Sequence, residues 1–414
     1  MNINRLSNFG FLIGAGLLAG AGCGGDDGAD SGELPDASNG NGNGNGNGSI
    51  VEVSEDIESD TTWGGDDTYL VTDEIDVEAR LTIEPGTLIE FEDSAGLEVD
   101  SSGILVAEGE SGNPITFVGT EASPGWWNGI FFTAGSNHVD NALDHVYIAD
   151  AGGDSLRRTS DASVIITSDA QASITNSTIE DGAGYGLFVF YDGELAAFEE
   201  NELTGHEEAP IRSGTIHLHH FDAASAYTGN GADVVIGGHT GPSVNDQTVE
   251  GDDRTWQDLG VPYELRADTR VVDVFLTLEA GTELRFATDT GLRLEDGAGI
   301  EARGDGDGED ERVVFTGTES SPGWWDGVQL RDAPQSASII EHALVEYGGA
   351  DSLGVAEEAN VSVGRDTDLE VRDAVIRESA NHGVWVSEDA TINEDVCTAN
   401  EFSGNDGDDC AGET

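Results

Sequence analysis

The sequence predicts an all-β protein in which short strands follow one another around a coil, each turn of the coil stacking on the next. Apolar residues alternate with polar ones over short runs such as 81–83, 89–91 and 115–117, and Gly, Asn, Asp or Ser separates the runs. No stretch keeps an apolar period of 3.6, so helices cannot supply the connections of a doubly wound parallel sheet. Short strands joined by Gly-containing turns indicate a solenoid.

An internal duplication at a spacing of about 195 residues is the third observation. DTTW at 60–63 returns as DRTW at 253–256, and LTIEPGT from Leu81 returns as LTLEAGT from Leu276. FVGTEASPGWWNGI from Phe117 likewise returns as FTGTESSPGWWDGV from Phe315. Such agreement predicts two tandem copies of one unit, which we place at 50–232 and 233–414, the second with a C-terminal cap.

The segments LTIEPGTLIEF, GLEV, ITFVGT and PGWWNGIFF, with their partners in the second copy, resemble the right-handed parallel β-helix repeat proteins of bacterial surfaces. Those proteins share the pectate-lyase-like superfold. The resemblance covers about residues 50–405 and implies a right-handed parallel β-helix of two tandem homologous halves. It says little about chemistry, because the family includes polysaccharide lyases, hydrolases and adhesins.

The N-terminus is typical of an exported protein. Residues 1–22 contain an apolar run from Phe9 to Ala21 that is too short to span a bilayer. The run ends in GAGC, which resembles a bacterial lipobox with Gly in place of the usual Leu and implies acylation of Cys23. The alternative is an ordinary secretory signal in which Cys23 is incidental. Residues 23–49, acidic and then Gly-Asn-rich, are predicted to form a disordered linker.

These features predict a lipid-anchored protein of the bacterial cell envelope, on the outer membrane and facing the exterior. The membrane would be contacted only through the N-terminal lipid, and we expect a monomer. If Cys23 is lipidated, Cys397 and Cys410 remain as an even pair in an oxidising compartment. We therefore predict a disulfide between them that closes the last turn of the coil.

The charge of the chain excludes several partners. Its 414 residues include 83 Asp and Glu against 16 basic residues, all of them Arg, for a formal net charge of −67. Such a surface repels phosphate backbones and anionic headgroups, so nucleic acid is not an expected partner. Cations are the natural counterparts of this surface.

No enzyme motif emerges from the sequence. G-x-S-x-G, H-E-x-x-H, Walker and C-x-x-C patterns are absent, and no Lys is present to act as a base. We assign no catalytic residue and favour a binding or scaffold module, adhesin-like or polysaccharide-binding. The alternative is a polysaccharide lyase or glycoside hydrolase that uses an acidic groove, Ca²⁺ and an Arg base.

Three glutamates of the first copy are replaced by arginines in the second copy. At an offset of 195, Arg285, Arg293 and Arg303 stand where the first copy has Glu90, Glu98 and Glu108. The favoured interpretation is local neutralisation of an acidic face, with Glu283, Glu295 and Glu301 as neighbouring partners. The sharper hypothesis is a ladder of guanidinium groups on neighbouring strands that binds an anionic polysaccharide. The same three residues are the candidate bases of the enzyme alternative.

Two tryptophan pairs, Trp126-Trp127 and Trp324-Trp325, recur in PGWW(N/D)G. Since successive strand residues alternate faces, one Trp of each pair should point outward and could stack on a sugar ring. Packing at a corner of the coil is the favoured alternative, because the pair recurs at the same place in both copies.

A candidate calcium loop lies at 305–310, DGDGED, where Asp305, Asp307 and Glu309 would supply hard oxygen ligands. Its sixth residue is Asp, where an EF-hand requires Gly, so a plain acidic turn is favoured. No cofactor is expected beyond Ca²⁺.

Overall fold

The computed structural model describes residues 48–153, 161–167, 169–190, 192–238, 247–306, 308, 311–351 and 357–413, which belong to one compact unit. The predicted leader at 1–22, Cys23 and the predicted linker up to residue 47 lie outside these residues. Asp307 and Glu309 lie outside them as well. Among the described residues, no helix is long and apolar enough to cross a membrane.

Two sheets are confined to the N-terminal half of this unit. Sheet A contains β1 (Ile50–Val53), β3 (Thr68–Val71), β6 (Leu88–Phe91), β9 (Ile115–Gly119), β12 (Val146–Ala149), β15 (Thr178–Glu180) and β18 (Glu202–Thr204). Sheet C contains β2 (Thr61–Trp63), β5 (Arg80–Ile83), β8 (Ile104–Glu108), β11 (Ala142–Asp144), β14 (Gln171–Thr175) and β17 (Glu194–Glu199).

Two further sheets are confined to the C-terminal half. Sheet D contains β21 (Thr248–Val249), β24 (Thr269–Val272), β27 (Gly291–Glu295), β30 (Gly327–Arg331), β33 (Ala359–Val363), β36 (His382–Val386) and β39 (Cys410–Gly412). Sheet E contains β22 (Arg254–Trp256), β25 (Phe275–Leu278), β28 (Gly299–Arg303), β31 (Ile339–Glu341), β34 (Asp368–Arg372) and β37 (Thr391–Ile392).

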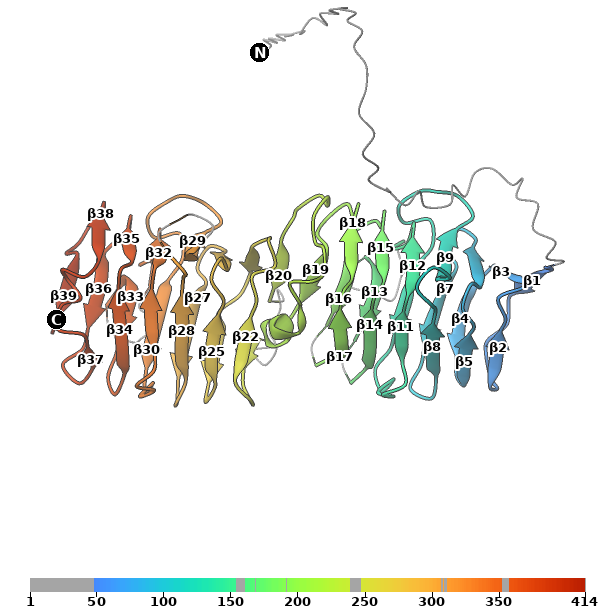
Figure 1. The fold of residues 1–414 in the computed structure, drawn as a ribbon, viewed down its shortest axis with the longest axis horizontal. Helices are drawn as coiled ribbons and strands as arrows, with labels where there is room; N and C mark the ends of the chain where they lie inside the picture. The colour runs from blue at the N-terminus through green and yellow to red at the C-terminus, as the bar shows by residue number, and fades with distance from the viewer. Residues whose placement is uncertain are drawn as a thin grey trace, which may run out of the picture. The chain divides into compact units, whose positions relative to one another are not determined.

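Sheet B, with thirteen strands, runs through both halves (Figure 1). Its N-terminal strands are β4 (Glu74–Val77), β7 (Gly96–Val99), β10 (Ile130–Phe132), β13 (Ala162–Ile166), β16 (Tyr185–Val189) and β19 (Ile211–Ser213). Its C-terminal strands are β20 (Val235–Gly237), β23 (Tyr263–Leu265), β26 (Glu283–Phe286), β29 (Val313–Gly317), β32 (Ala343–Glu346), β35 (Val375–Arg377) and β38 (Glu401–Ser403).

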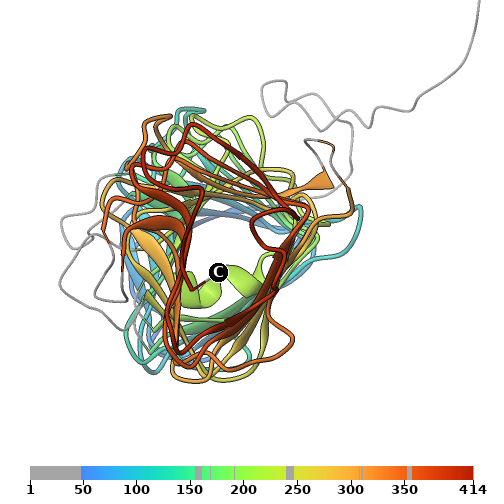
Figure 2. The ribbon, with the colours of Figure 1, turned by 90° about the vertical axis from the view of Figure 1, so that its left-hand side faces the viewer.

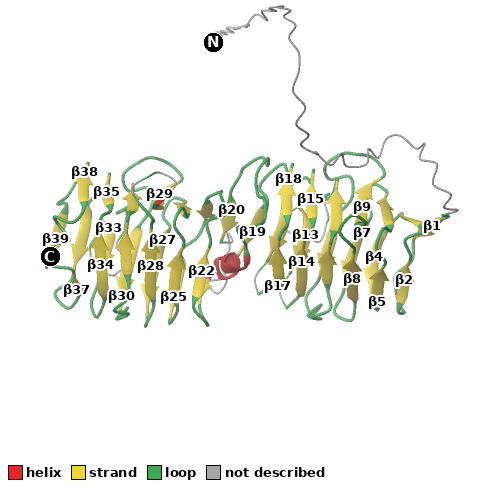
Figure 3. Ribbon diagram, in the orientation of Figure 1, coloured by secondary structure: helices red, strands yellow, loops and turns green. Residues whose placement is uncertain are grey.

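The all-β prediction is confirmed. All pairs between these strands are parallel, and nearly every strand pairs with the third strand after it, so the chain visits three sheets in turn before it returns to the first. This order is consistent with a parallel β-helix. Viewed along the row of strands, the sheets enclose a common interior (Figure 2), and the short 3₁₀ helix η1 (Thr215–His220) interrupts the strands near the middle (Figure 3).

The interior is apolar because alternate residues of each strand point into it. In β6, for example, Ile89 and Phe91 are fully buried while Leu88 and Glu90 are partly exposed. Phe91 stacks on Trp127 with ring centroids 4.0 Å apart, and Phe286 stacks on Trp325 at 4.2 Å. The charged residues are therefore displayed mainly on the outer faces of the sheets.

The register between sheets changes at the middle of the chain. Sheets A and C end at β18 and β17, sheets D and E begin at β21 and β22, and β19 pairs directly with β20 in sheet B. Segments with matching sequences consequently lie in different sheets. Phe117 lies on β9 in sheet A, whereas its counterpart Phe315 lies on β29 in sheet B.

Candidate functional site

A row of polar and aromatic residues lies on the outer face of sheet D, with two fully buried polar members at its centre. Strand register places Arg293, Gln329, Ser362 and Trp385 side by side on β27, β30, β33 and β36. Gln329 and Ser362 are fully buried although they point away from the apolar interior. The Gln329 amide donates to the carbonyl of Asp351 at 2.8 Å, and the Ser362 hydroxyl donates to the carbonyl of Glu357 at 2.8 Å. Asp351 and Glu357, which lie between β32 and β33, therefore cover part of this face.

Acidic residues gather at the edge of the same face. Asp268 and Asp326 immediately precede β24 and β30, and a carboxylate oxygen of Asp268 accepts a hydrogen bond from the backbone N–H of Gly291 at 3.2 Å. Asp326 is only 3% exposed, whereas Asp268 and Asp351 are exposed to solvent. The acidic group thus has a buried member and a solvent-accessible rim.

The environment of Asp326 favours its neutral form. Burial, and then the charges of Asp268, Asp351 and Asp289, raise the pKa of Asp326 to about 7, and Arg293 opposes them. The Asp326 carboxylate accepts no hydrogen bond from the described residues. Oε1 of the buried Gln329 has no partner either, although its Nε2 donates to the carbonyls of Asp326 and Asp351. The Gln329 amide oxygen therefore bears a desolvation cost that no described residue offsets, and burial penalises the charged form of Asp326.

The first half is built differently at the matching positions. Asn128 stands in place of Asp326, and its amide donates to Glu74 at 3.0 Å and to the carbonyl of Ser94 at 2.8 Å. Phe131 stands in place of Gln329, and register places it beside Ile165, which in turn lies beside Phe188. Ile165 and Phe188 belong to an outer apolar cluster against which Phe131 packs. The corresponding face is therefore apolar on sheet B and polar on sheet D.

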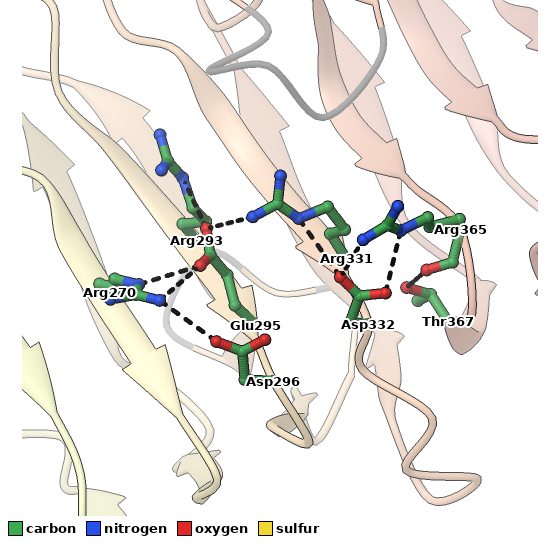
Figure 4. A network of polar contacts seen from close by, with 8 residues as sticks. All are labelled: Arg270, Arg293, Glu295, Asp296, Arg331, Asp332, Arg365 and Thr367. Atoms are coloured by element: carbon green, nitrogen blue, oxygen red, sulfur yellow. Dashed lines mark hydrogen bonds and ion pairs between the residues drawn. The ribbon is translucent and has the colours of Figure 1, made fainter.

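A network of ion pairs continues the row at the other end of the sheet D strands (Figure 4). The Glu295 side chain, 3% exposed, lies 2.9 Å from Arg270, 3.3 Å from Arg293 and 3.5 Å from Arg331. Asp332 accepts two hydrogen bonds of 3.0 Å from Arg365, which lower the pKa of Asp332. Glu295 thus links three arginines that come from three neighbouring strands.

The structure separates the three arginines of the ladder hypothesis. Arg285, Arg293 and Arg303 lie on β26, β27 and β28, which belong to sheets B, D and E, so they do not project from neighbouring strands of one sheet. Each is within 4 Å of an acid: Arg285 of Glu283 at 2.7 Å, Arg293 of Glu295 at 3.3 Å, and Arg303 of Glu301 at 3.5 Å and Glu341 at 3.2 Å. These contacts fit local neutralisation.

The tryptophan pairs lie at corners. Trp127 and Trp325 are fully buried, and each donates its indole N–H to a backbone carbonyl, of Ala149 and Glu346 respectively. Trp126 and Trp324 are half-buried against the core. Their indole N–H groups donate to Thr120 at 3.0 Å and Thr318 at 2.9 Å. Both members of each pair therefore make structural contacts, as the corner interpretation requires.

A second cluster of ligand-type side chains lies at the corner between sheets E and B. Ligand atoms of Glu341, His342 and Asp373 lie within 4.8 Å of one another, the only such group of three among the described residues. Glu341 is also held by Arg303 at 3.2 Å and Arg372 at 2.8 Å, which oppose a cation there. Asp305, from the predicted calcium loop, donates its backbone N–H to the carbonyl of Glu311 at 2.8 Å. That contact is typical of a turn.

The C-terminal edge of the unit carries a covalent link. Cys397 and Cys410 are joined in a disulfide with their Cα atoms 5.9 Å apart. Cys410 lies on β39, which pairs with β36 at the end of sheet D. The bridge therefore ties the last strand of that sheet to the preceding turn.

The sequence reasoning missed Asp326, Gln329, Asp268 and Asp351. The available signal was the change from WWNGIFF to WWDGVQL between the matched segments. That change replaces a neutral amide with an acid and an aromatic ring with an amide. Comparison with known proteins adds no assignment, because no protein-family model, curated protein or solved structure matches the chain.

Proposed function

We propose that the protein is a binding or scaffold module of the bacterial cell surface, a right-handed parallel β-helix of two tandem homologous halves held to the outer membrane through lipidated Cys23. Its partner would be an extracellular polysaccharide or another surface component. The observation that carries this proposal is sheet B, whose thirteen parallel strands form one uninterrupted platform. Strands at about 4.8 Å spacing give a rigid row of outward side chains suited to an extended partner.

The outward side chains of sheet B favour a partner that is not strongly anionic. Arg285 is paired with Glu283, and Arg377 is paired with Glu346 at 2.7 Å. Paired guanidinium groups on an acidic surface leave little net positive potential for repeated carboxylates. Neutral polysaccharides, or acidic ones bridged by a cation, are therefore the expected ligands.

The test is a panel of neutral and acidic polysaccharides, measured with the mature protein for binding by co-sedimentation and for cleavage by release of reducing ends. We expect binding without product. Release of reducing ends would replace the scaffold proposal with the enzyme, and failure to bind any member would remove the polysaccharide as partner. Cys23→Ala should move the protein from the membrane fraction to the medium.

A second candidate function, glycoside hydrolysis, is supported by one observation. A carboxyl group with a pKa near 7, beside other carboxylates, has the properties of a general acid paired with a base. Asp326 would be the acid, and Asp268 or Asp351 the carboxylate. If this candidate holds, Asp326→Asn abolishes release of reducing ends, while Asp93→Asn, an exposed acid in the first half, leaves it unchanged.

A further inference from the structure

We propose that a cavity at the corner between sheets E and B, lined by Arg312, Asp373 and Glu401, binds one uncharged sugar residue of a polysaccharide. This inference rests on the proposed function, because it assigns a subsite to the polysaccharide partner. The cavity has a volume of about 430 Å³. That volume lies within the range of about 300–1,000 Å³ that is usual for small-ligand pockets.

Turns that lead into sheet B supply the three charged side chains. Arg312 immediately precedes β29, Asp373 lies two residues before β35, and Glu401 is the first residue of β38. Sheet B places β32 between β29 and β35, and β35 beside β38. The cavity therefore extends along one corner of the coil over the turns before these neighbouring strands.

Arg312 is the arginine without a partner among the described residues. Its Nε is buried and has no hydrogen-bond partner, and it forms no ion pair with a described acid. Every other described arginine has an acid, a backbone carbonyl or an aromatic ring as a partner. A half-buried guanidinium that lines a cavity in so acidic a chain bears a desolvation cost, which a bound acceptor would offset.

The charged groups of the cavity select the chemistry of the ligand. The Arg312 guanidinium can only donate hydrogen bonds, and the carboxylates of Asp373 and Glu401 can only accept them. A carboxylate ligand would pair with Arg312 but would be repelled by the two acids, and an ammonium ligand would be repelled by Arg312. A hydroxyl group both donates and accepts. Neighbouring hydroxyls of one sugar ring can therefore satisfy both kinds of group with charge-assisted hydrogen bonds.

One wall of the cavity is held in place by the fold itself. The Asn400 amide donates to the carbonyls of Val371 and Val396 at 2.9 and 2.8 Å, and its oxygen accepts from the backbone N–H of Ala374 at 3.0 Å. The disulfide anchors the same segment through Cys397. A wall that is ordered without a ligand reduces the entropic cost of binding.

The first half has a different pair of residues at the matching positions. Pro114 stands in place of Arg312, and Asn176 stands in place of Asp373. The Asn176 amide donates to Asp144 at 2.8 Å, so its hydrogen bond is made within the fold. The corner can therefore form without the guanidinium and the carboxylate, which is expected if these two groups serve a ligand in the second half.

The test measures binding of uncharged tetrasaccharides of glucose, mannose and galactose to the full mature protein by calorimetry, with tetragalacturonate and alanine as charged comparators. We expect at least one neutral tetrasaccharide to bind saturably and neither comparator to bind. Arg312→Gln and Asp373→Asn should each weaken that binding at least ~10-fold, because each removes a charge-assisted hydrogen bond. Arg80→Gln and Asp93→Asn, at an ion-paired arginine and an exposed acid of the first half, should leave the affinity unchanged.

Chemical labelling provides a measurement that does not depend on the stability of a variant. Phenylglyoxal reacts with guanidinium groups, and mass spectrometry reports the rate at each arginine. A saturating neutral tetrasaccharide should slow the modification of Arg312 in the wild-type protein and leave that of Arg80 unchanged.

The outcomes separate this inference from the proposed function. Weakening by Arg312→Gln and Asp373→Asn no greater than in the two controls, or failure of the sugar to protect Arg312, overturns the cavity as a subsite and leaves the polysaccharide partner in place. Binding of tetragalacturonate or alanine that depends on Arg312, without binding of a neutral sugar, overturns the ligand class. If no neutral tetrasaccharide binds, the inference is overturned, and co-sedimentation with the polysaccharide panel then decides the proposed function.

Discussion

The outer face of sheet B at β10, β13 and β16 and the outer face of sheet D at β30, β33 and β36 share strand register and matching sequence, yet one is apolar and the other polar. The first aligns Phe131, Ile165 and Phe188, and the second aligns Gln329, Ser362 and Trp385. The difference shows that the backbone tolerates either chemistry, so the polar version, which leaves the Gln329 amide oxygen without a hydrogen bond, requires an explanation beyond folding.

Truncation of the apolar face should have the largest effect. Phe188→Ala should lower the unfolding free energy of the protein by about 3–4 kcal/mol, because the Phe188 side chain is only 2% exposed within the outer apolar cluster. Trp385→Ala at the matching place should lose about half as much, because Trp385 is only partly buried. Denaturant unfolding of both variants measures the difference, and equal losses would show that the two faces are packed alike.

Removal of the disulfide should rank next. The bridge encloses a sequence separation of 13 residues, so Cys397→Ser with Cys410→Ser should lower the unfolding free energy by about 3 kcal/mol. The loss should concentrate at the C-terminal edge of sheet D. Hydrogen exchange should therefore accelerate in β36 and β39 but not in β1 or β3, and uniform acceleration would contradict a local role.

Loss of the ion-pair centre should cost slightly less. Glu295→Gln leaves Arg270, Arg293 and Arg331 without their shared carboxylate, and we expect a loss of about 2–3 kcal/mol, since Glu295 is buried but its partners are partly exposed. Asp100→Asn, the position in the first half at the same offset of 195, should cost only about 1 kcal/mol, because Asp100 accepts only local hydrogen bonds, from the backbone of Ser102 and Gly103 and from the Ser102 hydroxyl. Chemical denaturation at fixed salt compares them.

The pH dependence of the unfolding free energy tests the raised pKa of Asp326. Its folded pKa, about 7, lies above the ordinary value of an unfolded Asp, so the unfolded chain releases this proton first as pH rises. Stability associated with the neutral carboxyl is full below pH ~4 and is lost as pH rises through ~7. The stability of Asp326→Asn relative to wild type should therefore increase by up to about 4 kcal/mol between pH 4 and pH 8. A constant difference between the two proteins across this range would contradict the shift.

Salt should produce the smallest change in stability, and the size of the change should differ between the two halves. Screening relieves repulsion among acids and weakens exposed ion pairs, and 11 of the 16 arginines lie at or after Arg254. With a net charge of −67, relief dominates, so NaCl should raise the melting temperature. Hydrogen exchange should slow more in β6 and β8 than in β27 and β28. A melting temperature independent of salt would show that the charge is harmless.

Local sequence patterns were sufficient to predict the strands and the side chains that they bury. Alternation at 89–91 predicts which side chains enter the interior, and Ile89 and Phe91 are indeed fully buried. The absence of helical periodicity predicts strands joined by turns, as the structure shows, whereas the parallel direction of the strands was implied only by the resemblance to parallel β-helix proteins. These features are determined by neighbouring residues, because the two-residue period of a strand depends only on the local backbone.

The sheet to which each strand belongs was decided by tertiary structure. Direct pairing of β19 with β20 places matched segments in different sheets, and consecutive strands lie in different sheets, so Arg285, Arg293 and Arg303 are dispersed. The same long-range pairing brings Asp268 and Asp351 close enough for their charges to raise the pKa of Asp326. Spacing along the chain cannot reveal such a group, because the members meet only after intervening strands have stacked and removed Asp326 from water.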